Sequence, residues 1–186
     1  GREVHIRPQS YSVTSRAGVR FRRWNGALIP IAAPKDRDGN RSNYRTWGLL
    51  ELPGRPGELS VYATEAYYKG PASRIRRFTF RTDGFVSVQA PAHGELLTRP
   101  LRFEGRSLEL NVKTAPAGRI AVELQDGGGR VLPGFAAADC VPFTGDAIAH
   151  TVAWKGGPDL ARLAGRPVRI RFALEAADLF SMKFNA

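Results

Sequence analysis

The stretch SLELNVKTAPAGRIAVELQD, residues 107–126, constrains the fold of this chain more than any other part of the sequence. Apolar and polar residues alternate over 108–112, and the alternation returns over 120–124. A two-residue period directs one row of side chains into a core and the other into water, as in antiparallel strands covered on one face. The Ala-Pro-Ala-Gly segment at 115–118 therefore predicts a connection between two strands, either a hairpin or a crossover between sheets.

Short strands separated by turn residues are predicted along most of the chain. Twenty Gly and thirteen Pro among 186 residues are typical of many strands joined by turns. Three strand pairs are expected in the first half: 11–14 with 19–24, 47–52 with 58–64, and 74–81 with 85–90 through the turn Asp83-Gly84. Further strands are expected at 95–98, 101–104, 150–155, 166–174 and 179–184. The pattern predicts an all-β chain that contains an antiparallel β-sandwich.

The positive charge of the chain comes mainly from arginine. Of the 28 basic residues that produce the net charge of +11, only five are Lys. The Arg residues are spread from Arg2 to Arg171, whereas nucleic-acid binders usually gather charge on one face or one helix. We therefore expect solvated strand faces and no nucleic-acid partner. An Arg-driven binder of polyanions is the alternative, and the densest groups lie at 20–23 and 74–77.

The sequence predicts neither a membrane-spanning segment nor an intrachain disulfide. No apolar run approaches the length that crosses a bilayer, so no membrane partner is expected. Cys140 is the only cysteine, which excludes an intrachain disulfide, and we expect it to be a small buried hydrophobic residue.

Seven stretches of the chain, taken in order, carry a resemblance to a known family. They are SRAGVRFRRWNGALIP (15–30), WGLLELPGRPGELSVYATEAYY (47–68), RRFTFRTDGFVSVQAP (76–91), SLELNVKTAPAGRIAVELQD (107–126), LPGFAAADC (132–140), GD (145–146) and WKGGPDLARLAGRPVRIRFALEAADLFSMKF (154–184). They resemble the C-terminal part of bacterial five-bladed β-propeller glycoside hydrolases of the invertase and arabinanase type. The resemblance implies closing propeller strands over 1–70, an appended β-sandwich over 72–186, a boundary near Pro71, and an extracellular or periplasmic location.

The same resemblance implies that this chain lacks a complete catalytic pair. In these families the aspartate nucleophile or base lies in the first blade and the acid in a middle blade, and the chain begins after both. Sugar hydrolysis needs two facing carboxyl groups. We therefore expect the tail of a longer protein: a non-catalytic, carbohydrate-associated module that supports the propeller and helps to bind glycan. A lone blade exposes sheet edges, so residues 1–70 are expected to need a propeller domain, a partner chain or a second copy as in a homo-oligomer.

Glu65 and four aromatic residues are the candidate site residues. Glu65 ends a predicted strand among aromatic residues, where a carboxylate could bond a sugar hydroxyl or transfer a proton. An ion pair with one of the many Arg residues is the alternative. If Glu65 is catalytic, the active site needs a second carboxylate from a missing or partner domain. The aromatic candidates for stacking on sugar rings are Trp24, Trp47, Tyr67 and Tyr68, with core or interface packing as the alternative for each.

No metal or other cofactor is expected from the sequence, and a structural calcium ion is the weaker alternative. The loop DRDGNRS at 36–42 places oxygen ligands at alternate positions, but its Gly comes fourth instead of sixth and Trp47 takes the place of the closing Glu. A polar loop is therefore favoured. A structural ion in the sandwich would draw on Asp139, Asp146 and Asp178. The three histidines, His5, His93 and His150, are too far apart in the sequence for a zinc site.

Overall fold

The computed structural model describes residues 11–15, 18–29, 44–67 and 70–186. The chain divides into two compact units, Gly1–Thr82 and Asp83–Ala186. The described residues form strands and two short 3-10 helices, η1 at Gly70–Ala72 and η2 at Leu160–Leu163, and contain no α-helix. All strand pairings are antiparallel, so the predicted all-β antiparallel architecture is confirmed. No helix in this part of the chain is long and apolar enough to cross a membrane.

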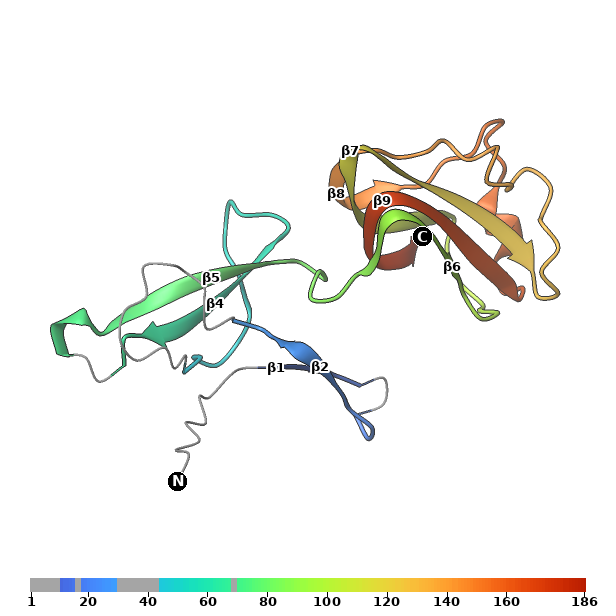
Figure 1. Ribbon diagram of the computed structural model, residues 1–186. Coiled ribbons are helices and arrows are strands. Elements are labelled where there is room, and N and C mark those ends of the chain that lie inside the picture. Colours follow the sequence, from blue (N-terminus) through green and yellow to red (C-terminus); the bar gives the residue numbers. More distant parts are fainter. Residues whose placement is uncertain (1–10, 16–17, 30–43, 68–69) are drawn as a thin grey trace, which may run out of the picture. The chain divides into compact units, whose positions relative to one another are not determined.

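The first unit contains a hairpin and a three-stranded sheet (Figure 1). The hairpin pairs β1 (Tyr11–Thr14) with β2 (Arg22–Ala27), and the sheet has the order β3 (Leu50–Glu51), β4 (Glu58–Glu65), β5 (Arg74–Arg81). The predicted pairing of segments 47–52 and 58–64 is confirmed by the β3–β4 register, in which Leu50 lies opposite Ser60.

The partner of β5 differs from the one expected. The sequence predicts a hairpin between 74–81 and 85–90, but β5 pairs with β4 along all eight residues, from Arg81 opposite Glu58 to Arg74 opposite Glu65. Charge favours this pairing, because both glutamates of β4 form ion pairs with arginines of β5: Glu58 with Arg77, and Glu65 with Arg74 and Arg76. Residues 74–81 therefore belong to the first unit, and the two units divide at 82–83, beyond the boundary expected near Pro71.

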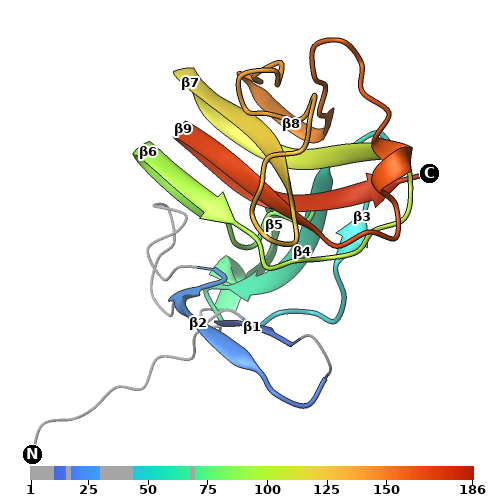
Figure 2. The ribbon, with the colours of Figure 1, turned by 90° about the vertical axis from the view of Figure 1, so that its right-hand side faces the viewer.

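The second unit is built on one four-stranded sheet with the order β6–β9–β7–β8. Its strands are β6 (Val88–Leu97), β7 (Ser107–Asp126), β8 (Asp146–Thr151) and β9 (Val168–Asn185). Figure 2 shows β6, β9 and β7 side by side, with β7 and β9 strongly curved.

The predicted connection at 115–118 is wrong: β7 continues through it as one strand of 20 residues. In the same way, the two strands expected at 166–174 and 179–184 form the single strand β9. The reason is tertiary, since β9 pairs with β7 from one end to the other and carries it across the interruption. The ladder shifts register between Thr114 and Arg119, and Ala176 on β9 has a φ of 41° at the same place. Such an irregularity bends both strands.

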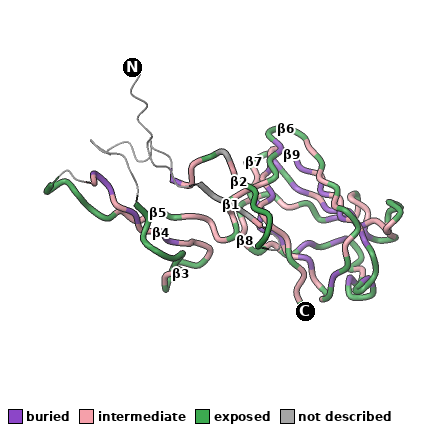
Figure 3. Tube along the Cα trace, turned by 90° about the horizontal axis from the view of Figure 1, so that it is seen from below, coloured by how far each residue is buried: buried purple, intermediate pink, exposed green. Residues whose placement is uncertain are grey.

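The core of the second unit lies on one face of this bent sheet. The alternating apolar residues of 108–112 and 120–124 are buried, as predicted, and they belong to a single cluster with residues of β9. Figure 3 shows this buried stretch along β7 and β9. Phe135 and Trp154 pack edge to face with ring centroids 5.2 Å apart, and Trp154 Nε1 donates a hydrogen bond to the carbonyl oxygen of Val122 at 3.0 Å. The expected burial of Cys140 is confirmed.

Candidate binding groove

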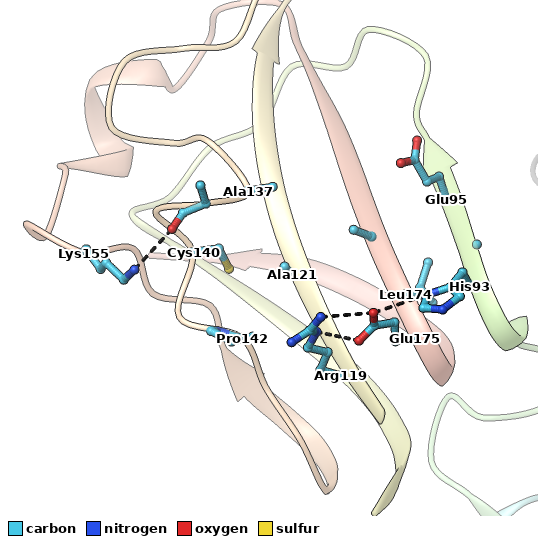
Figure 4. Close-up of a pocket in the computed structure, with 13 residues that line it drawn as sticks. His93, Glu95, Arg119, Ala121, Ala137, Cys140, Pro142, Lys155, Leu174 and Glu175 are labelled. Carbon is cyan, nitrogen blue, oxygen red and sulfur yellow. Dashed lines mark hydrogen bonds and ion pairs between the residues drawn. The ribbon is translucent and has the colours of Figure 1, made fainter. Parts of the chain in front are cut away.

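A groove of 540 Å³ lies against the second unit's sheet (Figure 4). Its lining comes from β6, β7 and β9, from the loop segment 137–142, and from Lys155. The loop segment follows the edge of β7, where Phe143 and Ile120 form a β-bridge. Most of the groove's charged side chains belong to the row of strand positions that alternates with the core residues. The two-residue period that buries one row therefore leaves this second row available for contacts outside the core.

Small residues form the floor of the groove. Ala121 on β7 lies directly opposite Ala173 on β9, and Ala173 in turn lies opposite Glu95 on β6. Gly94 also lines the groove. Two facing methyl groups leave a depression between larger neighbours, because cross-strand partners stand about 5 Å apart and fill the surface only as far as their side chains reach.

One side of the floor carries a cross-strand row formed by an arginine, a glutamate and a histidine. The guanidinium of Arg119 holds the carboxylate of Glu175 through two contacts, from Nε at 2.5 Å and from Nη2 at 3.0 Å. His93 Nδ1 lies 3.3 Å from the same carboxylate. In the register of the sheet these three residues stand opposite one another on β7, β9 and β6. The side chains of Arg119 and His93 are 60% and 79% exposed, so solutes can reach this row.

On the other side of the floor, the groove-lining Glu95 belongs to a network centred on Arg171, which is not itself a lining residue. Arg171 donates to both carboxylate oxygens of Glu95, with Nε at 3.1 Å, and its Nη1 lies 3.6 Å from Glu123. Glu123 is largely buried and also accepts hydrogen bonds from Gln125 Nε2 at 2.9 Å and from the backbone N–H of Ala137 at 3.2 Å. The hydrogen bond from Arg171 holds the pKa of the Glu95 carboxyl below its ordinary value. The same contact raises the pKa of Arg171.

The pKa shifts of two groove residues disfavour specific catalytic roles for them. A general acid at neutral pH needs a carboxyl group with a raised pKa, whereas that of Glu95 is lowered. Cys140 lines the groove, but burial raises the pKa of its thiol, which disfavours the nucleophilic thiolate. Arg–carboxylate pairs instead present fixed hydrogen-bond donors and acceptors.

Glu65, the catalytic candidate, is fully buried at the end of β4. Its Oε2 accepts hydrogen bonds from Arg74 Nε at 2.5 Å and from Arg76 Nε at 2.8 Å. The sequence predicts this ion pairing as the alternative to a catalytic role for Glu65. The contacts join β4 to β5, since both arginines lie on the neighbouring strand.

The aromatic candidates belong to the first unit, whereas the groove lining is drawn wholly from the second unit. Trp24 on β2 has the guanidinium of Arg22 over its ring, 4.5 Å from the centroid. Trp47 is fully exposed, at 101% of its reference area. Tyr67 packs against Tyr44 with ring centroids 4.8 Å apart. Tyr68 lies outside the described residues.

The described residues contain no group of three or more His, Cys, Asp and Glu side chains that could hold a metal ion. Two of the aspartates considered for a structural ion have other contacts: Asp146 pairs with Lys113 at 3.2 Å, and Asp178 accepts a hydrogen bond from Ser87 at 2.8 Å. The loop 36–42 lies outside the described residues.

Comparison with protein-family models, with curated proteins and with solved structures found no match for this chain.

The groove residues were absent from the sequence-based candidates. A signal for them existed, since Arg119 and Glu123 flank Ala121 in the polar row of 107–126. Reading it requires the β7–β9 register, which sets Glu175, Ala173 and Arg171 opposite those three residues. A pattern within one strand contains no information about that register.

Proposed function

We propose that this chain is a non-catalytic, carbohydrate-associated module of a glycoside-hydrolase-like protein, and that the groove of its second unit contacts glycan. The resemblance to the C-terminal part of propeller glycoside hydrolases supplies the class of ligand. On this proposal the second unit, with its single bent sheet, takes the place of the appended β-sandwich, and the first unit that of the closing strands of a propeller. The remaining blades, from the same protein or a partner chain, would cover the exposed edge of the β3–β4–β5 sheet, and the location would be extracellular or periplasmic.

The observation that carries the proposal is the Ala121–Ala173 floor between two Arg–Glu groups. A sugar ring has an apolar face and a rim of hydroxyl groups that both donate and accept hydrogen bonds. Methyl groups on the floor allow such a ring to approach the sheet. The pair Arg119–Glu175 then provides donors and acceptors on one side, and Glu95, held in place by Arg171, provides acceptors on the other.

Filling the groove tests this proposal. Ala173→Leu adds a branched side chain to the floor and is expected to weaken binding of neutral fructan or arabinan oligosaccharides by about tenfold or more, equivalent to about 1.4 kcal/mol. Isothermal titration calorimetry on the full chain measures the affinity. Ala161→Leu, an exposed position in η2 outside the groove, is the matched control and is expected to bind like the unaltered chain. Equal affinity in all three proteins, or no binding of either oligosaccharide, would contradict the proposal.

A further inference from the structure

The two structural units differ sharply in charge. Residues 1–82 contain 16 Lys and Arg against 6 Asp and Glu, a net charge of +10, whereas residues 83–186 contain 12 against 11, a net charge of +1. Nearly all of the chain's charge of +11 therefore belongs to the first unit. Arginines occur along the whole sequence, but the boundary at 82–83 shows that the net positive charge is concentrated in residues 1–82.

Among the described residues of the first unit, arginines outnumber carboxylates. Its described residues include nine arginines and three glutamates. Of these glutamates, Glu65 is fully buried between Arg74 and Arg76, and Glu58 is paired with Arg77. Only Glu51 is left among them for the other arginines.

Two of these arginines, Arg20 and Arg22, belong to the β1–β2 hairpin. Arg20 and Arg22 are exposed, and among the described residues no carboxylate lies within ion-pair distance of either. The Arg22 guanidinium rests on the ring of Trp24, 4.5 Å from the centroid. A ring beneath a guanidinium holds the planar group in place while leaving its N–H edge able to bond an anion. We name Arg20, Arg22 and Trp24 the arginine platform.

We propose that the arginine platform binds acidic polysaccharide through its carboxylate groups. A guanidinium matches a carboxylate with two parallel hydrogen bonds, and charge complementarity follows from the +10 of the unit. Single-stranded nucleic acid is the competing polyanion, and the experiment below separates it from acidic polysaccharide. The choice of a glycan as the carrier of the carboxylates rests on the proposed function. The platform would hold an acidic chain, while the groove contacts neutral sugar.

Binding of polygalacturonate to the full chain tests this inference. Affinity is expected to fall steeply as the salt concentration rises, because condensed counterions are released on binding. R20Q/R22Q removes two charges and is expected to weaken binding by roughly tenfold, as two exposed ion pairs of up to about 1 kcal/mol each would do. The matched control R99Q/R166Q removes two exposed charges from the second unit and is expected to leave affinity unchanged.

Each other outcome of the experiment overturns the inference. They are no binding of polygalacturonate, salt-independent binding, equal losses in R20Q/R22Q and R99Q/R166Q, and tighter binding of a single-stranded oligodeoxynucleotide of equal charge. Circular dichroism establishes that the variants are folded, and R20K/R22K provides a second test, since it keeps the charge while removing the bidentate geometry and is expected to retain part of the affinity. Failure of the proposed function appears separately, as loss of neutral-oligosaccharide binding with polygalacturonate binding intact.

Discussion

Gly118 shows how one residue permits the bend of the second sheet. A Cβ at this position would lie 2.5 Å from the carbonyl oxygen of Ala176 and 2.6 Å from that of Glu175. Real side chains do not approach backbone oxygens so closely, so glycine is required because β9 passes directly over it. Ala176 has a positive φ at the same point, and the two residues together mark where β7 and β9 change direction.

Gly118→Ala is therefore expected to destabilise the second unit by about 2–3 kcal/mol, because backbone rather than a flexible side chain has to move. Urea unfolding measured by circular dichroism gives the free energy of unfolding. Gly127→Ala is the control, since its Cβ would lie 3.7 Å from Pro167, an ordinary contact distance. Equal stability of the Gly118 and Gly127 variants would show that the crossing is not tight.

At the scale of elements, the β4–β5 pair is held at one end by a buried carboxylate. Glu65 is fully buried, while the side chains of Arg74 and Arg76 are 48% and 28% exposed. The carboxylate cannot turn to water, but the guanidinium groups are partly solvated. Removing Glu65 therefore costs less than removing the arginines would, because the partly exposed guanidinium groups regain water, whereas an unpaired carboxylate would stay buried.

Glu65→Gln is expected to lower the stability of the first unit by about 2 kcal/mol, less than breaking a fully buried pair because Arg74 can regain water. Thermal unfolding followed by circular dichroism measures the loss, with Glu51→Gln on exposed β3 as the control. If Glu65 served catalysis instead, Glu65→Gln would abolish a measurable glycosidase activity while leaving the unfolding temperature unchanged.

At the scale of the whole molecule, two carboxylates of the second unit make the free energy of unfolding depend on pH under acidic conditions. Hydrogen bonding from Arg171 lowers the pKa of Glu95, and the backbone N–H of Arg130 lowers that of Asp126. Asp126 Oδ1 accepts from the N–H groups of Gly128 and Arg130, each at 2.9 Å, and so closes the turn after β7. A depressed folded-state pKa means that folding favours the charged form.

The stability from these groups is therefore complete above their ordinary pKa values of 4.5 and 3.8, and is lost as the pH falls through the lower folded-state values. Urea unfolding between pH 6 and roughly pH 2 is expected to show this decline. In Glu95→Gln/Asp126→Asn the decline is expected to be shallower, because two of the titrating groups are gone. An unchanged pH profile in that variant would mean that other groups control acid unfolding.

The sequence predicts the buried face of a strand better than it predicts which strands are neighbours in a sheet. The apolar rows of 108–112 and 120–124 and the pairing of β3 with β4 follow from local pattern and a short turn. The partner of β5 does not, because a tight Asp-Gly turn competes with an eight-residue ladder that closes across a longer loop. Of the candidate site residues, Glu65 drew attention through its place at a strand end, but only the structure shows the two arginines around its carboxylate.

By itself the sequence determined which side chains of each strand face a core, because a two-residue period is a property of one strand. The tertiary structure alone decided which strands are neighbours, that β7 and β9 run unbroken through a bend, and where the charge boundary falls. Register between distant strands depends on contacts that no local pattern contains. For the same reason the Ala121–Ala173 floor and its flanking Arg–Glu pairs exist only once β7 and β9 are aligned.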